Sequence, residues 1–385
     1  LFPYTTLFRS AGILEKSLKA SFSRCPYVSK KIIFTQDWAL LFKGKMRYSR
    51  TVMTKNDRKA AVKKLRTLVY SPKQQIEDFR KDLDKKLSRS ILPNHVECSE
   101  QIYGSVSCDI LVPEMYSMHK IMIYVHGGCF VGGSRKAWRE FCASLAAATS
   151  CRIALPEYRL APAYAFPAAV EDLQSVFRNV WTEEQVSCSL DSTDAKTQEA
   201  PEIIVAADGS GASLAMSLIL SLKERYRACI KQVILFSPWL NLSPNSALLK
   251  NKKSRDEVLH SESIRRCGDI YTYSGNLENP MVSPMFISDE ALVNFPPIYI
   301  QMGQKEILLE EAKEFQKKLQ KAGCACDLDV WPEMMFMFQM ADEFLAQSHL
   351  AIEKIGKFVT FKREEADEQT SKRSPALESG VTVEA

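Results

Sequence analysis

Short apolar runs separated by amphipathic stretches form the pattern of the chain from about residue 95 onward. The apolar runs are rich in β-branched residues and have the length of buried strands, whereas the stretches between several of them suit helices. Strands that alternate with helices predict a largely parallel sheet covered on both faces. The expected strands are 105–112, 119–125, 151–156, 202–207, 231–236, 296–302 and 325–331, and the expected helices are 138–149, 166–180, 211–227, 309–322 and 340–358.

Other parts of the chain depart from this alternation. Residues 11–90 are rich in Lys, Arg, Leu and Ala and predict helices without a sheet. The polar, turn-rich segment 183–201 predicts a surface loop, and 238–295 predicts an excursion over one edge of the sheet. From residue 363 the chain is charged and poor in core residues, which predicts a disordered tail.

The first ten residues, L-F-P-Y-T-T-L-F-R-S, look like the in-frame translation of a common sequencing adapter. We interpret them as an artefact joined to a truncated gene, which makes targeting unreadable from this end. The expected organisation is an artefact at 1–10, a helical segment contributing to a cap at 11–90, an α/β domain at 91–362 with a cap insertion at about 240–280, and a tail at 363–385.

Composition excludes several classes of protein. Hydrophobic residues make up 46% and charged residues 25% of the chain, as in ordinary soluble globular proteins. The net charge of +5 is spread over 51 basic and 46 acidic residues without a dense basic block, so no nucleic-acid partner is indicated. Eleven cysteines without a C-x-x-C pair indicate free thiols in a reducing cytoplasm and no metal site. No apolar run approaches the ~18 residues of a membrane span.

Y-V-H-G-G-C-F-V-G-G-S at 124–134 is the most specific motif in the chain. It is followed, in order, by Y-R-L-A-P at 158–162 with F-P-A-A-V-E-D at 166–172, S-P-W-L-N-L at 237–242, S-P-M at 283–285 and E-I-L-L-E-E at 306–311. With these landmarks the chain resembles the hormone-sensitive-lipase branch of the α/β-hydrolases, the HGGG-type or fold-3 group, over roughly 95–358. The resemblance implies an α/β-hydrolase fold with a helical cap, an esterase- or lipase-like activity, and no metal or organic cofactor.

Active members of that family use a Ser–acid–His triad in this chain order, together with an oxyanion hole. The segment I-I-V-A-A-D-G-S-G-A-S-L-A at 203–215 is similar to their strand-to-helix elbow, but G-x-S-x-G is absent. Asp208 matches the acidic residue before the nucleophile, which places the nucleophile position at Gly209. Ser210 could serve as nucleophile only after a one-residue shift, which would require glycine where Asp208 and Ala212 stand. We therefore interpret Ser210 as a hydroxyl like that of a helix N-cap.

The resemblance places the acid of the triad at Glu306 and its base at Phe336. Glu306 follows the strand P-P-I-Y-I-Q-M, where relatives have Asp or Glu. Phe336 stands where they have His, in W-P-E-M-M-F-M-F-Q. The histidines of the chain offer no obvious substitute: they are His95, His119, His126, His260 and His349.

The oxyanion hole needs backbone amides rather than side chains, so the resemblance implies that it is retained. The expected donors are the amides of Gly127, Gly128 and Ser210. His126 opens the loop as it does in the family. Cys129 replaces the third glycine, which strains the loop if that position needs a positive φ, and we interpret its thiol as a buried small apolar group.

These residues leave three hypotheses. The first is a pseudoenzyme, catalytically inactive because Gly209 and Phe336 replace the triad Ser and His, that binds a small apolar, acyl or ester-like ligand. The second is an active carboxylesterase that uses Ser210 as a non-standard nucleophile. The third is a structural or interaction protein that docks through its basic helices before residue 90. No protein partner can be named from the sequence.

Overall fold

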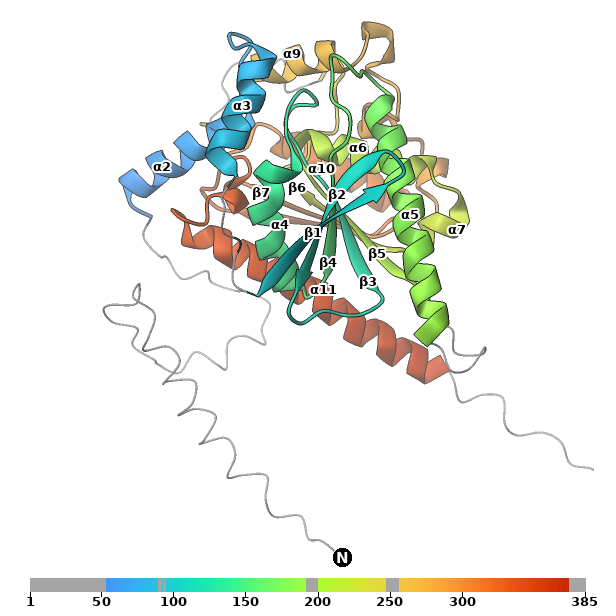
Figure 1. The fold of residues 1–385 in the computed structure, drawn as a ribbon. Coiled ribbons are helices and arrows are strands. Elements are labelled where there is room, and N and C mark those ends of the chain that lie inside the picture. The colour runs from blue at the N-terminus through green and yellow to red at the C-terminus, as the bar shows by residue number, and fades with distance from the viewer. Residues whose placement is uncertain (1–52, 89–91, 93–94, 192–199, 247–255, 374–385) are drawn as a thin grey trace, which may run out of the picture. The chain divides into compact units, whose positions relative to one another are not determined.

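The computed structural model describes residues 53–88, 92, 95–191, 200–246 and 256–373, with side chains to Val359 (Figure 1). The predictions for 1–10, for 11–52 and for 374–385 lie outside the described residues.

The core is an eight-stranded sheet in the order β1-β2-β4-β3-β5-β6-β7-β8. Strands β3 to β8 pair in parallel, whereas β1 pairs antiparallel with β2 and β2 antiparallel with β4. This confirms the predicted α/β-hydrolase architecture. The strands are β1 (Val96–Tyr103), β2 (Val106–Pro113), β3 (Lys120–Val125), β4 (Arg152–Pro156), β5 (Glu202–Asp208), β6 (Ile230–Phe236), β7 (Ile298–Gly303) and β8 (Cys326–Trp331).

Strand β1 is the element that the sequence did not predict. It lies at the edge of the sheet, and within it only Val96 and Tyr103 are buried. Because its middle is polar and exposed, V-E-C-S-E-Q-I-Y carries no apolar run of the kind that marks the inner strands.

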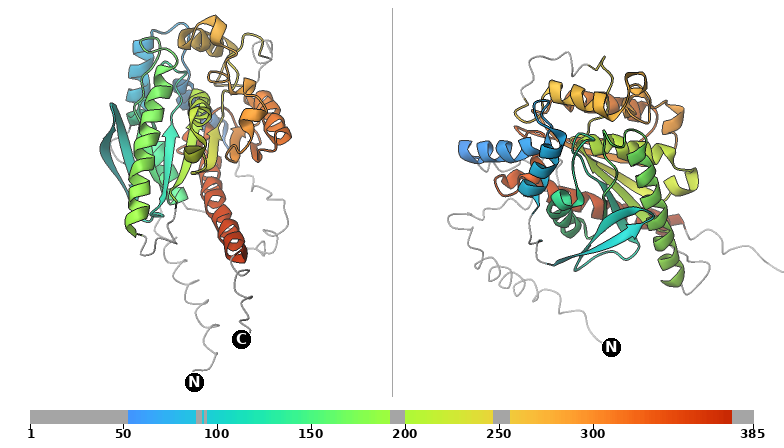
Figure 2. Two further views of the ribbon diagram at one scale, coloured as in Figure 1. Left: turned by 90° about the vertical axis from the view of Figure 1, so that its right-hand side faces the viewer. Right: turned by 45° about the horizontal axis from the view of Figure 1, so that its top comes forward.

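Helices cover both faces of the sheet (Figures 1 and 2). Helix α4 (Arg135–Thr149) packs against α11 (Ala346–Arg373), and α5 (Ala168–Asp191) packs against α6 (Gly209–Ser221). Two predictions are wrong here. Helix α5 continues to Asp191, through the start of the expected loop, and α11 continues to Arg373, past the expected start of the tail. Within the described chain, no helix has both the length and the apolar character needed to cross a membrane.

Helices α3 (Ile76–Leu87) and α9 (Ser261–Tyr271) lie at the top of Figure 1, and α2 (Lys55–Leu65) lies at its left. The short helix η2 (Arg66–Leu68) follows α2 directly in the chain. Helix α3 is tied to the domain because the Arg80 guanidinium donates to the carbonyls of Val131 at 2.7 Å and Ala161 at 2.9 Å. The remaining helical elements are α7 (Glu224–Arg227), η3 (Ser274–Asn276), η4 (Pro284–Phe286), η5 (Glu290–Leu292), α10 (Leu309–Lys321) and η6 (Phe338–Met340).

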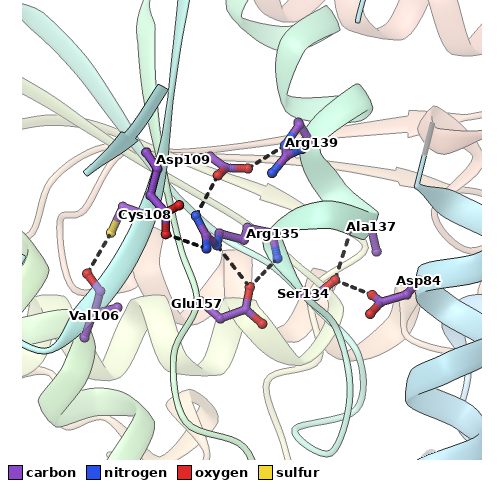
Figure 3. Close-up of polar contacts among 10 residues, drawn as sticks. Asp84, Val106, Cys108, Asp109, Ser134, Arg135, Ala137, Arg139 and Glu157 are labelled. Carbon is purple, nitrogen blue, oxygen red and sulfur yellow. Dashed lines mark hydrogen bonds and ion pairs between the residues drawn. The ribbon is translucent and has the colours of Figure 1, made fainter. Parts of the chain in front are cut away.

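Polar contacts at the start of α4 join the helix to the sheet and to α3 (Figure 3). Asp109, buried on β2, forms ion pairs with Arg135 at 2.9 Å and Arg139 at 2.6 Å. The hydroxyl of Ser134 accepts from the Ala137 amide, as an N-cap does, and donates to Asp84 on α3 at 2.5 Å. Since Ser134 also ends the glycine-rich loop after β3, these contacts fix one end of that loop.

Candidate functional site

The three predicted triad positions meet at the carboxyl edge of the sheet. Gly209 follows β5 directly, Glu306 lies in the loop after β7, and Phe336 lies in the loop after β8. A Cβ atom added to Gly209 would lie 3.4 Å from Cζ of Phe336, an ordinary van der Waals distance. The structure therefore brings the predicted nucleophile position and the predicted base position into contact.

The bend between β5 and α6 is built on glycine. Gly209 has φ +49°, a left-handed conformation that other residues adopt only with strain. Gly211, two residues further on, leaves no room for a side chain, because a Cβ there would lie 2.3 Å from the Val125 carbonyl oxygen. The position with the strained backbone, where an elbow holds its nucleophile, is thus Gly209 rather than Ser210.

Apolar side chains fill the space in front of Gly209, which we call the corner. Phe336 is only 6% exposed, and the neighbouring Met334, Met335 and Met337 are buried as well. The cavity that remains has a volume of ≈20 Å³, room for about one water molecule. Its lining is Leu68, Val69, Gly128, Cys129, Asp208, Gly209, Ser210, Trp239, Leu259, Ile264, Leu308 and Phe336.

Glu306 is buried and only half satisfied. Its Oε1 accepts hydrogen bonds from the Ser237 hydroxyl at 2.8 Å and from the Gly303 amide, whereas its Oε2 has no hydrogen-bond partner. Burial raises the pKa of the Glu306 carboxyl well above its usual range, against the effect of these hydrogen bonds, which lower it. Burial therefore favours the protonated form of this carboxyl, and Oε2 lacks the partner that an imidazole would supply.

Ser210 is hydrogen bonded to the glycine-rich loop. Its hydroxyl accepts a hydrogen bond from the Phe130 amide at 3.2 Å, and no described imidazole lies within bonding range of it. The expected N-cap-like role is wrong, because the N-cap of α6 is Asp208 and Ser210 ties the elbow to the glycine-rich loop instead. A serine without a base keeps its proton at neutral pH.

The loop after β3 has positive φ at Gly128, Cys129 and Phe130, and its free amides differ from the expected set of donors. The Gly127 amide donates to Oδ1 of Asp208 at 2.9 Å, so it is already engaged. The amides of Gly128 and Cys129, next along the loop, donate to no other described residue, and both residues line the small cavity. Cys129 has φ +60°, the strained conformation that its place in a glycine motif suggested.

Asp208 holds the elbow against the sheet. Its Oδ1 accepts three hydrogen bonds, from the Tyr124 hydroxyl at 2.9 Å, the Trp138 indole at 2.8 Å and the Gly127 amide. Burial raises the pKa of Asp208 to about 7, although each of these hydrogen bonds lowers it. The side chain is 2% exposed and serves to position the backbone.

His126 is a structural residue rather than a displaced base. Its Nδ1 donates to the Gly127 carbonyl at 2.8 Å, and its ring stacks on Tyr158 with centroids 4.3 Å apart. The Tyr158 hydroxyl donates to the His126 carbonyl at 2.5 Å. Burial lowers the pKa of His126 to about 4, so the imidazole stays neutral and fixes the shape of the loop.

Three residues of the site were not singled out from the sequence. Ser237 orients Glu306, and it also accepts a hydrogen bond from the Met337 amide at 3.1 Å. Tyr124 and Trp138 hold Asp208. A signal for Ser237 was present, since it opens the S-P-W-L-N-L landmark. Tyr124 likewise opens the motif at 124–134, whereas for Trp138 the sequence offers only apolar character. No group of three or more His, Cys, Asp or Glu side chains in the described part of the chain is arranged to hold a metal ion.

Comparison with known proteins agrees with the α/β-hydrolase fold of this chain. A family model described as alpha/beta hydrolase fold matches residues 122–340. An acetyl-hydrolase of Streptomyces hygroscopicus is 27% identical over 62% of this chain and 75% of its own length, and an esterase of Acinetobacter venetianus is 28% identical over 63% and 76%. The crystal structure of an esterase from the bacterial hormone-sensitive lipase family superposes with a TM-score of 0.68 at 23% identity, over 80% of this chain and 98% of that one.

Proposed function

We propose, starting from the fact that this chain belongs to the alpha/beta hydrolase fold family, in its hormone-sensitive-lipase branch, that it is a catalytically silent member which acts by binding rather than by ester hydrolysis. One observation carries the proposal. The strained bend of the elbow carries Gly209, and the phenyl ring of Phe336 lies at van der Waals distance from the place of its missing side chain.

Ester hydrolysis by this fold needs a hydroxyl that attacks the acyl carbon and an imidazole that accepts its proton. At Gly209 there is no side chain to attack, and a phenyl ring neither accepts nor donates a proton. Removing Ser or His from a comparable triad lowers turnover by roughly 10⁶-fold, about 8 kcal/mol, and the second loss adds little because the residues act together. The remaining amides of Gly128, Cys129 and Ser210 could still stabilise an oxyanion, but they have no nucleophile to assist.

The small volume of the corner bears on what the protein binds. A cavity of ≈20 Å³ has no room for an acyl chain unless Phe336 moves. The former acyl site is therefore a poor place for the ester-like ligand that the sequence suggested. We place the retained binding function elsewhere on the domain.

The test is the hydrolysis of p-nitrophenyl acetate and p-nitrophenyl butyrate by the purified chain, compared with a buffer blank and with Ser210→Ala. We expect rates at the blank for both proteins. Turnover by the parent chain that Ser210→Ala abolishes would overturn the proposal in favour of an esterase with Ser210 as nucleophile. Turnover that survives Ser210→Ala would point to a contaminating hydrolase, and repurification of Ser210→Ala would remove it.

A further inference from the structure

A second, much larger cavity lies between the N-terminal helices. It has a volume of ≈600 Å³ and is lined by residues of α2, η2 and α3, by Val69 and Gln74 from the segment between η2 and α3, and by Glu257. Val69 is the one residue that lines both this groove and the ≈20 Å³ corner at Gly209. The groove is therefore a separate site that shares a wall with the former catalytic centre.

Positive side chains dominate the walls of this groove. Six cations line it, Lys55, Arg58, Lys59, Lys63, Arg66 and Lys86, against two carboxylates, Asp82 and Glu257. On α2 the cations recur at a spacing of four residues, which places them on neighbouring rows of one helix face. The face that α2 turns toward the groove is thus a cationic one.

The two carboxylates are already paired. Arg58 and Glu257 form an ion pair at 2.6 Å, and Lys86 and Asp82 form one at 3.0 Å. The side chains of Lys55, Lys59 and Lys63 form no ion pair with another described residue. Like charges four residues apart repel one another and destabilise a helix, so this row weakens α2 unless an anion lies against it.

The floor of the groove is apolar and rests on the glycine-rich loop. Phe79 is 2% exposed, and Val62 and Val69 lie beside it in the lining. A Cβ added to Gly132 would lie 2.5 Å from Cε1 of Phe79, so the loop packs directly under this ring. A ligand in the groove would meet positive charge at the rim and a ring at the base.

We propose that this groove binds a small amphipathic organic anion, with its carboxylate or phosphate group among Lys59, Lys63 and Arg66 and its apolar part over Phe79 and Val69. The volume falls in the range of small-molecule sites, about 300–1,000 Å³. A membrane surface or an acidic protein would favour a flat cationic face, whereas this one is concave with an apolar base. The proposal rests on the binding role inferred above and adds the class of ligand and the place where it binds.

The test uses octyl phosphate as probe, followed by isothermal titration calorimetry, with neutral octanol for comparison. The test variant is Lys59→Gln/Lys63→Gln. The matched control is Lys317→Gln/Lys321→Gln, which removes two exposed lysines at the same spacing on α10, outside the lining of the groove. Circular dichroism confirms that both variants fold.

We expect octyl phosphate to bind the parent and the control with the same affinity, and to bind the test variant at least about tenfold more weakly, because each tenfold step needs only 1.4 kcal/mol of lost attraction. Raising NaCl from about 50 to about 500 mM should weaken binding to the parent more than to the test variant. Octanol should bind much more weakly than octyl phosphate.

Four results would overturn the proposal: no heat of binding with octyl phosphate, equal weakening in the two double variants, equal affinity for octanol, or binding only to vesicles of anionic lipid. Loss of binding in Gly209→Ser/Phe336→His would place the ligand in the former catalytic corner instead. The two proposals fail separately. Hydrolysis of p-nitrophenyl esters tests the proposed loss of catalysis, whereas calorimetry with octyl phosphate tests binding in the groove.

Discussion

Two cavities that share Val69 as a wall have opposite characters. The corner at Gly209 holds ≈20 Å³ and is filled by Phe336, whereas the groove between α2 and α3 holds ≈600 Å³ and is rimmed by lysine and arginine. In the corner the backbone has a strained bend at Gly209, where we propose that the side chains that do chemistry are replaced. The lining of the groove contains none of the family's sequence landmarks, and its lysine and arginine side chains create the proposed site. A backbone that resembles a catalytic elbow therefore does not establish catalytic activity. A helix without a catalytic motif can carry a binding surface.

The largest effect is expected when the serine and the histidine of a triad are introduced into the corner. The double substitution Gly209→Ser/Phe336→His supplies a hydroxyl at the bend and an imidazole at position 336, and Oε2 of Glu306 has no hydrogen-bond partner in the parent chain. We expect p-nitrophenyl butyrate hydrolysis at least ~10³-fold above the parent, with each single substitution near the parent because the groups act together.

A matched control for that gain is Glu306→Gln in the double variant, which should lower the recovered rate because the imidazolium loses its partner. A double variant that folds yet stays as slow as the parent would show that the corner cannot host a triad.

A second prediction concerns the packing of the corner. Replacing a buried phenyl ring by a methyl group leaves a void, so Phe336→Ala should lower the free energy of unfolding by about 3–5 kcal/mol. Phe286→Ala is the control, because Phe286 is 38% exposed and its truncation should cost little. Urea unfolding measures both. Equal losses in the two variants would mean that Phe336 does not fill the corner.

The third prediction concerns the buried carboxyl of Asp208. Since its pKa is raised to about 7 in the folded chain, the folded state binds more protons than the unfolded state between pH ~4 and 7. Its contribution to stability is thus full below pH ~4 and is lost as the pH rises through 7. Asp208→Asn keeps an acceptor for Tyr124, Trp138 and Gly127 without the titration.

The free energy of unfolding of Asp208→Asn should therefore fall less with rising pH than that of the parent, by up to about 4 kcal/mol across this window. Denaturant unfolding at pH 4.5 and 7.5 tests it. Parallel pH profiles for the two proteins would show that Asp208 titrates as an ordinary exposed carboxyl.

The smallest expected effect is that of Ser210→Ala. The substitution leaves the buried Phe130 amide without its acceptor, which should cost about 1–3 kcal/mol of stability. Thermal unfolding measures the loss. A variant as stable as the parent would show that the bond between elbow and loop contributes nothing.

The sequence predicted those features that depend on the order of neighbouring residues in the chain. Inner strands were found because they are continuous apolar runs, and the bend at Gly209 was placed because Asp208 and the following helix start fix its register. The histidine-free loop at Phe336 followed from the same kind of landmark. Each of these needs only neighbours in the chain.

What the sequence missed depends on contacts between distant segments. The Gly127 amide was assigned to the oxyanion hole because its motif suggested it, but Asp208, far along the chain, takes its hydrogen bond. The edge strand β1 was missed because its middle is solvated. The groove could not be predicted, since its lining comes from α2, α3, the segment that joins them and the distant Glu257.

Labelling with a fluorophosphonate tests the central claim most directly, because this reagent forms a covalent bond with an activated serine and with little else. Intact-mass analysis of the parent chain should show no adduct, while Gly209→Ser/Phe336→His gains one adduct at Ser in position 209. An adduct on the parent chain, mapped by peptide analysis to Ser210, would contradict the account.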